Sequence, residues 1–327
     1  MDAQPRATAD PIRPDRALRV VVGVDGSAGS LVALRWAMHW ANVRDAEVAV
    51  LAAYPTVAYW SDAEFVDLGA LDAVHDDTWA RARAAVDAVR DSDSTVRDVP
   101  VSLHVEPGPA AAQLVRQSAD ADLLVVGSRG RSAVRSALLG SVALHSVSAA
   151  ECPVVVVPLP GRWAEPGADS RVVVGSDGSE RSTAAIAAAL TEAGPGGSVT
   201  VVRSHDITDQ WSDGYGVPAA TNPQVHDDAL GRMEALLGEL LVATAGEHPA
   251  VRRLSLTGPA GAVLVEQAAD ADLLVVASRG HGEFRGLVFG SVALHCVVHA
   301  PCPVLVVRPT VRQLPARMTP AASVASA

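Results

Sequence analysis

The chain has 327 residues, of which 49% are hydrophobic and 19% are charged, so it is long enough for two domains with substantial cores. Its formal net charge is −11, and all 26 basic residues are arginine. An acidic chain without basic clusters is a poor candidate for binding nucleic acid or a membrane surface, so we expect neither as a partner.

The first 17 residues are polar and proline-rich, and we expect them to form a disordered tail. They lack the apolar core of a secretory signal. No apolar run in the sequence approaches the roughly 18 residues that a membrane-spanning helix needs. We therefore expect a cytoplasmic protein.

Apolar runs of strand length alternate with segments of helical periodicity after this tail. Strands are predicted at residues 20–24, 48–53, 101–105, 123–126 and 154–157. Helices are predicted at residues 30–42, 73–91, 110–118 and 141–149. The strands are continuously apolar rather than alternating, which indicates a parallel sheet covered by helices on both faces.

The second half of the chain repeats the first. RVVVG occurs at 19–23 and 171–175, ADADLLVV at 119–126 and 269–276, and GSVALH at 140–145 and 290–295. The repeat distance changes only from 152 to 150 residues, so the halves are expected to share one fold. We predict an α/β protein of two tandem open five-stranded parallel sheets flanked by helices, in a Rossmann-like arrangement.

Domain boundaries follow from the repeat and from composition. We predict one domain over residues 18–158 and a second over residues 171–309. Residues 159–170 are rich in proline and glycine, as is typical of a linker, and residues 310–327 are expected to form a second disordered tail. The last strands of the halves, 154–157 and 304–307, would lie at sheet edges that need covering, so we expect them to pair within the chain.

Three cysteines occur, Cys152, Cys296 and Cys302. The odd count and the absence of a C-x-x-C pair argue against a disulfide framework and a structural zinc site. Cys152 and Cys302 each precede a proline and a valine-rich strand, so we interpret them as small buried hydrophobic residues.

A glycine-rich loop follows the fourth predicted strand. Gly127 ends the strand, Gly130 comes three residues later, and Gly140 and Ser141 stand at the start of the next helix. Glycine lets the backbone approach a ligand closely, and the N–H groups of such a loop and of a helix N-terminus bind anions. Together with Arg129 as a cation, these residues form a candidate phosphate site. The alternative is a plain turn followed by a helix that the Ser141 hydroxyl caps.

Other nucleotide-binding signatures do not occur in the sequence. The chain has no lysine, which excludes the G-x-x-x-x-G-K-[ST] loop of P-loop NTPases. No G-x-G-x-x-G follows the first strand, which argues against a standard dinucleotide dehydrogenase.

The spacing G-x2-G-x9-G-[ST] of Gly127, Gly130, Gly140 and Ser141 resembles the ATP-binding signature of the universal stress protein family. VVVGVDGS at 20–27, ADLLVVGSRG at 121–130 and CPVVVV at 152–157 extend the resemblance. It covers both halves and is similar to the tandem-domain members of mycobacteria and related actinobacteria. It implies a fold like that of the adenine nucleotide alpha hydrolases.

The resemblance implies that each half binds ATP at the carboxyl ends of its first and fourth strands, with Mg2+ arriving on the nucleotide and no metal site made of protein side chains alone. In the first half the implied residues are Gly23, Asp25, Ala53, Gly127, Arg129, Gly130, Gly140, Ser141 and Val142. In the second half they are Gly175, Asp177, Ser204, Ala277, Arg279, Gly280, Gly290, Ser291 and Val292. Asp25 and Ala53 would border the adenine and ribose, and the glycines with Ser141 would hold the phosphates. Asp25 also has a simpler interpretation as a turn residue.

The second half departs from this pattern at Ala277, which stands where the first half has Gly127. If this position needs a positive φ, alanine is strained there by about 1 kcal/mol. If the backbone is extended, the methyl group only narrows the approach to the ligand. Either way the sequence supports nucleotide binding by the second half less strongly than by the first, although the other glycines still favour a second site.

Two further motifs have structural interpretations. VHDD at 74–77 suggests a metal, but adjacent helical residues point in different directions, so we expect a helix start with acidic residues near its positive end. Trp60 and Trp211 follow the second strand of each half, where they could cover a nucleotide, pack at an interface or fill the core.

Three functions remain open from the sequence. The first is an ATP-binding regulatory protein of the stress or dormancy response, forming a homodimer and acting on a protein partner that the sequence does not identify. The second is a slow ATPase or phosphotransferase, for which no catalytic base beyond Asp25 is evident. The third is a nucleotide-free interaction module, which the retained glycines disfavour.

Overall fold

The computed structural model describes residues 17–54, 68–130, 139–159, 164–205, 223–243, 247–278 and 289–308. The strands of the first half are β1 (Arg19–Gly23), β2 (Glu47–Tyr54), β3 (Val101–Pro107), β4 (Leu123–Gly127) and β5 (Val154–Val157). Its helices are α1 (Ala28–Arg44), α2 (Leu68–Ser92), the short 3-10 helix η2 (Ser94–Val96), α3 (Ala110–Ser118) and α4 (Ser141–Ala149).

The second half repeats this order. Its strands are β6 (Arg171–Gly175), β7 (Ser198–His205), β8 (Ala250–Thr257), β9 (Leu273–Ala277) and β10 (Val304–Val307). Its helices are α5 (Glu180–Ala193), α6 (Pro223–Ala243), α7 (Ala260–Gln267) and α8 (Ser291–His299). The α/β fold and the repeat are therefore confirmed.

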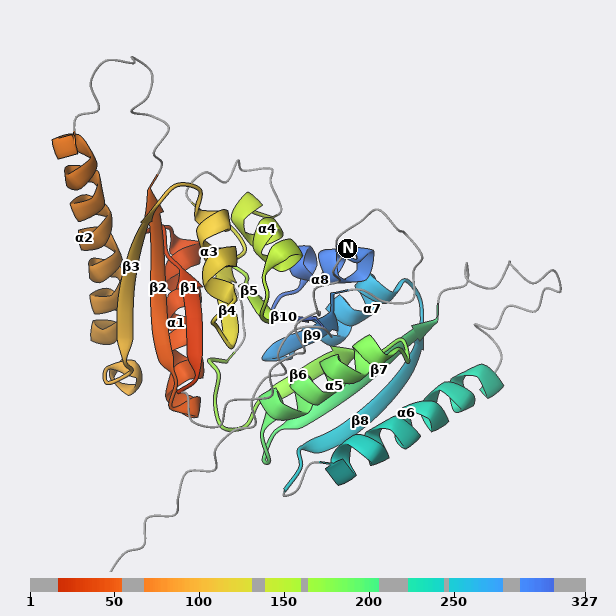
Figure 1. Ribbon diagram of the computed structural model, residues 1–327. Helices are drawn as coiled ribbons and strands as arrows, with labels where there is room; N and C mark the ends of the chain where they lie inside the picture. The colour runs from red at the N-terminus through yellow and green to blue at the C-terminus, as the bar shows by residue number, and fades with distance from the viewer. Residues whose placement is uncertain are drawn as a thin grey trace, which may run out of the picture.

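The two five-stranded sheets join into one sheet of ten strands in the order β3-β2-β1-β4-β5-β10-β9-β6-β7-β8 (Figure 1). All pairs within each half are parallel, whereas β5 and β10 pair antiparallel, with Val155 opposite Leu305. The apolar edge strand of each half is covered by the other, as the sequence predicts.

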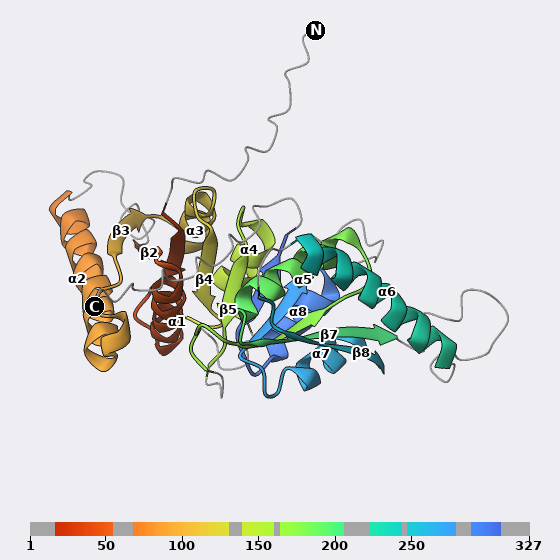
Figure 2. The same cartoon turned by 90° about the horizontal axis from the view of Figure 1, so that it is seen from below.

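Helices cover both faces of this sheet (Figures 1 and 2). Side chains alternate along each strand, so Val20 and Val22 pack with α1 and α2 while Val21 packs with α3 and α4. We call the face that α1 and α2 cover the first face and the face that α3 and α4 cover the second. In the second half, α5 and α6 cover the first face, and α7 and α8 cover the second. Burial on both faces explains why the strands are continuously apolar.

A buried ion pair connects the two halves on the first face. The guanidinium of Arg44 in α1 lies 2.8 Å from the carboxylate of Glu192 in α5, and the indole N–H of Trp40 donates to the same carboxylate at 3.2 Å. The Arg44 guanidinium also lies 4.4 Å from the centre of the Trp40 ring. Trp40 and Glu192 occupy equivalent positions of the repeat, 152 residues apart, so this contact lies where the halves meet.

The three cysteines are free and buried. Burial raises the pKa of both Cys296 and Cys302 to about 12. The burial of Cys152 and Cys302 confirms their interpretation as small hydrophobic residues.

The expectation that VHDD starts a helix is wrong. The helix α2 begins at Leu68, well before His75, and its first turn contains no acidic residue. Asp77 instead pairs with Arg81 one turn later at 2.8 Å, as exposed helical neighbours do. Trp60 and Trp211 lie outside the described residues.

Among the described residues, no helix combines the length and the apolar character that crossing a membrane requires.

Candidate functional site

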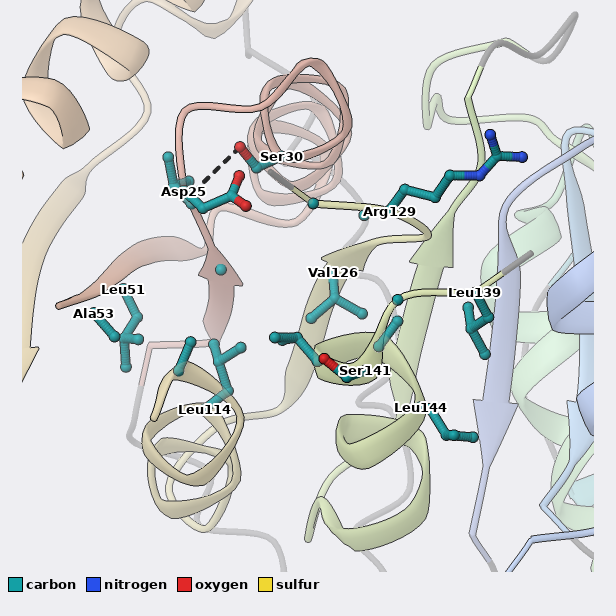
Figure 3. A pocket seen from close by; sticks show the side chains of 18 residues that line it. Asp25, Ser30, Leu51, Ala53, Leu114, Val126, Arg129, Leu139, Ser141 and Leu144 are labelled. Carbon is teal, nitrogen blue, oxygen red and sulfur yellow. Dashed lines mark hydrogen bonds between the residues drawn. The ribbon is translucent and has the colours of Figure 1, made fainter. Parts of the chain in front are cut away.

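A cavity of about 480 Å3 lies at the carboxyl ends of β1 and β4 (Figure 3). This is where strand order reverses in the first half, since β1 is flanked by β2 on one side and β4 on the other. The cavity is lined by all nine residues predicted for the first half: Gly23, Asp25, Ala53, Gly127, Arg129, Gly130, Gly140, Ser141 and Val142.

Helix α4 points its N-terminus at this cavity without a side-chain cap. Gly140 is the N-cap residue, with φ −73° and ψ 149°, and as a glycine it makes no side-chain cap bond. In α1, by contrast, the Ser27 side chain caps the helix by accepting from the Ser30 N–H. Ser141 is the first helical residue rather than the cap, so the capping interpretation of its hydroxyl is wrong. The first-turn N–H groups of α4 remain available to an anion.

Three glycines allow the segments around the cavity to pack closely. A Cβ atom on Gly127 would lie 2.6 Å from the Gly29 carbonyl oxygen, and one on Gly29 would overlap the Arg129 carbonyl oxygen. A Cβ atom on Gly130 would lie 2.7 Å from the Asp25 carboxylate. The first turn of α1 and the loop after β4 therefore meet backbone to backbone.

Asp25 holds the turn after β1 and also borders the cavity. Its Oδ1 accepts from the Ser27 N–H at 2.9 Å, and its own N–H donates to Ser30 Oγ at 3.3 Å. The other carboxylate oxygen faces the backbone of Gly130. Asp25 is therefore both a turn residue and a residue of the cavity, because the turn directs its carboxylate along the cavity rim.

The sequence did not single out the apolar walls of the cavity. Leu51 from β2, Leu114 from α3, and Leu139 and Leu144 next to or within α4 line it (Figure 3). Leu114 packs within 3.0 Å of the position that a Cβ on Gly23 would take. The alternation along β2 could have indicated Leu51, since it shares a sheet face with Ala53, but the helical leucines carry no local signal.

In the second half, the predicted residues Gly175, Asp177, Ser204, Ala277, Gly290, Ser291 and Val292 also lie at strand ends and at a helix start. Helix α8 begins like α4, with Gly290 as N-cap at φ −74° and ψ 146° and without a side-chain cap. The remaining two residues, Arg279 and Gly280, lie outside the described residues.

The structure decides between the two interpretations of Ala277. Neither Gly127 nor Ala277 has a positive φ, so the strain expected under the first interpretation does not arise. The second half also has Arg181 where the first has Gly29. Two side chains thus replace the two glycines at which α1 and the loop after β4 touch, so the second half does not repeat this contact between glycines.

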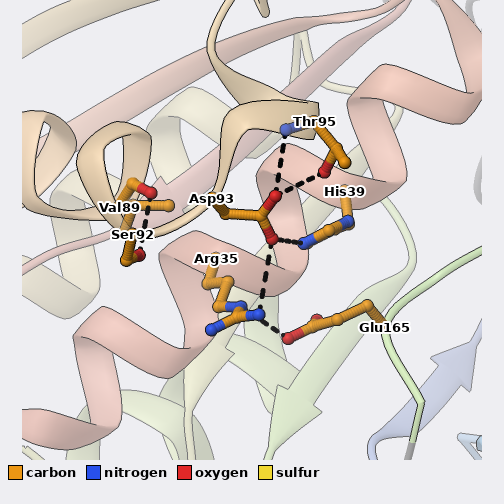
Figure 4. A network of polar contacts seen from close by, with 7 residues as sticks. All are labelled: Arg35, His39, Val89, Ser92, Asp93, Thr95 and Glu165. Atoms are coloured by element: carbon orange, nitrogen blue, oxygen red, sulfur yellow. Dashed lines mark hydrogen bonds and ion pairs between the residues drawn. The ribbon is translucent and has the colours of Figure 1, made fainter.

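A network of titratable side chains lies away from the cavity (Figure 4). Asp93, the N-cap of η2, accepts from Thr95 Oγ1 at 2.6 Å and contacts the His39 ring at 2.9 Å. Arg35 of α1 lies 3.4 Å from Asp93 and 2.7 Å from Glu165, which belongs to the segment between the halves. Burial raises the pKa of Glu165. The network thus ties this segment to the first half.

Replacing Asp93 with asparagine is expected to destabilise the protein at neutral pH and to reduce its loss of stability in acid. Hydrogen bonds from the Thr95 hydroxyl and N–H lower the pKa of Asp93 from 3.8 to about 2. A lowered pKa in the folded state stabilises above pH 3.8, and this contribution is lost as the pH falls toward 2.

Urea midpoints between pH 7 and pH 2 would test this prediction. The Asp93→Asn curve should approach that of the wild type below pH 4. The exposed neighbour Asp91 provides a matched control, since Asp91→Asn should give a curve parallel to the wild type. A difference in urea midpoint between Asp93→Asn and the wild type that stays constant at every pH would contradict the prediction.

Comparison with known proteins decides the family. The model of the Universal stress protein family matches residues 17–158 and again residues 170–308. The chain belongs to the universal stress protein family. Its two domains make it a tandem member, and membership of this family places it among stress-response proteins.

Relatives agree with this family assignment, and a solved structure agrees with the fold. A universal stress protein of Mycolicibacterium smegmatis is 33% identical over 296 residues, which covers 89% of this chain and 97% of the relative. Universal stress protein Rv2623 of Mycobacterium tuberculosis is 33% identical over 297 residues, which covers 89% of this chain and 96% of the relative. The crystal structure of a universal stress protein from Archaeoglobus fulgidus has a TM-score of 0.63 at 19% identity, covers 89% of this chain and 98% of its own, and supports the fold.

Proposed function

We propose that the first half of this universal stress protein binds ATP in the cavity at the ends of β1 and β4 and acts as a nucleotide-dependent regulator. The observation that carries the proposal is the uncapped N-terminus of α4, which opens into a cavity of about 480 Å3. Small-molecule pockets typically measure about 300–1,000 Å3.

The surroundings of the cavity suit the parts of a nucleotide. The apolar walls around Leu51 and Leu114 offer a surface for a flat base. The Asp25 carboxylate at the rim can accept from ribose hydroxyls. The N–H groups of α4, with Arg129 beside them, suit phosphate oxygens.

Mg2+ is expected to accompany the nucleotide. Asp25 is the one carboxylate among the described residues that line the cavity, and Mg2+ commonly combines one or two carboxylates with phosphate oxygens and retained waters. A single exposed carboxylate that already accepts a turn hydrogen bond is a weak general base, so we favour regulation over catalysis. Homodimerisation and a protein partner remain predictions, and sedimentation of the purified chain with and without ATP would test the first.

Replacing Gly140 with glutamate tests the site. A carboxylate at the N-cap of α4 would lie at the mouth of the phosphate-binding turn and repel the nucleotide, so we expect ATP affinity to fall at least about 100-fold, which corresponds to roughly 3 kcal/mol. Isothermal titration calorimetry on the full chain would measure the affinity. Adenine nucleotide released on denaturing the purified protein would give an independent count.

Gly238 in α6 provides the matched control. It is exposed, and a Cβ atom on it would meet no described residue within 4 Å, so Gly238→Glu adds the same charge far from the cavity. We expect this variant to bind ATP like the wild type. A wild type that neither retains nucleotide nor binds added ATP would refute the proposal.

A further inference from the structure

The turns that follow the first strand of each half have the same backbone and different surroundings. Gly26 and Gly178 both have φ +80°, and Asp25 and Asp177 each accept from a serine N–H two residues later at 2.9 Å. Among the described residues, a Cβ atom on Gly26 would meet nothing within 4 Å. A Cβ atom on Gly178 would lie 2.8 Å from Nη1 of Arg203, so a guanidinium covers the turn of the second half, whereas no described residue covers that of the first.

Arg203 belongs to β7, the strand next to this turn. It lies in β7 at the position that Ala52 occupies in β2, and Ala52 is a buried residue between two residues that line the first cavity. Burial lowers the pKa of Arg203, with the like charge of Arg232 adding to this and Asp177 opposing it. A guanidinium remains charged despite such a shift, so a permanent cation lies over Gly178, the residue that follows Asp177.

The neighbouring polar group of the second half is also engaged within the protein. Ser204, which stands where the first half has Ala53, donates its hydroxyl to the carbonyl of Gly258. The second half therefore has a hydroxyl bonded within the protein where the first half has only a methyl group.

We propose that Arg203 covers the turn that carries Asp177 and so blocks nucleotide recognition by the second half, leaving one tight ATP site per chain, in the first half. This inference rests on the proposed function of the first half. A nucleotide that approaches this turn would have to displace a charged guanidinium, which the turn after β1 does not require.

Stoichiometry and reciprocal substitutions test the proposal. Calorimetry of the full chain with ATP and Mg2+ should give one tight site. Ala52→Arg, which copies the second half into the first, should weaken that site at least about 10-fold. Ala52→Met serves as the uncharged control of similar length and should retain most of the affinity. In a Gly140→Glu background, Arg203→Ala should restore measurable ATP binding.

The possible outcomes distinguish failure of this inference from failure of the proposed function. Two equivalent ATP molecules per wild-type chain, or an Ala52→Arg variant that folds and binds like the wild type, would overturn the inference. Loss of binding on Arg203→Ala would do the same, because it would show that Arg203 holds phosphate. Wild-type protein that binds no ATP would instead refute the proposed function of the first half, so the two failures are distinguishable.

Discussion

Replacing Glu192 with alanine is expected to lower the free energy of unfolding by about 3–5 kcal/mol, because a buried ion pair that loses one partner leaves a charge uncompensated. The side chains of Arg44 and Glu192 are almost fully buried. Burial lowers the pKa of Arg44, and the charge of Glu192 opposes this shift. The indole N–H of Trp40 would also lose its acceptor. Urea unfolding followed by circular dichroism measures the effect.

An exposed pair serves as the control for this experiment. Arg83 and Asp87 lie one turn apart on α2 at 3.8 Å, and such pairs contribute less than about 1 kcal/mol, so Asp87→Ala should have little effect. A double variant with apolar residues, Arg44→Met with Glu192→Leu, should recover much of the stability lost in Glu192→Ala. A Glu192→Ala protein within about 1 kcal/mol of the wild type would show that the pair is not effectively buried in solution.

Replacing Gly29 with alanine is expected to weaken ATP binding at least about 10-fold and to destabilise the first half by roughly 1–3 kcal/mol. The new methyl group would overlap the Arg129 carbonyl oxygen and contact Leu159, so α1 and the loop after β4 must move apart. That movement separates the Asp25 turn from Gly130. Calorimetry with ATP and thermal unfolding measure the two effects.

A glycine in an open helical position provides the comparison. A Cβ atom on Gly231 of α6 would meet nothing within 4 Å, so Gly231→Ala should leave ATP affinity unchanged and stabilise the helix by up to about 1 kcal/mol. Equal behaviour of Gly29→Ala and Gly231→Ala in both measurements would show that close backbone packing at Gly29 is unimportant.

The repeat and the glycine spacing were enough to predict the architecture and one side of the candidate site. Strand β5 and helices α3 and α4 have the predicted bounds, because their apolar runs end at sharp turn signals. The start of α2 was misplaced, since helical periodicity is weak before Ala73 and the helix continues back to Leu68. Arg203 was missed because nothing in its local sequence distinguishes it from a solvent-exposed strand residue.

The sequence by itself determined the two-domain α/β fold, the family and the residues that gather at the ends of β1 and β4, since hydrophobic periodicity and motif spacing are local properties. Only the tertiary structure decided how the halves differ. The contact of Gly29 with Arg129, the pairing of Trp40 with Glu192, and the reach of Arg203 over Gly178 join residues that are distant in the chain or lie on different elements. Their effects depend on atomic separations of a few ångströms, which no local pattern encodes.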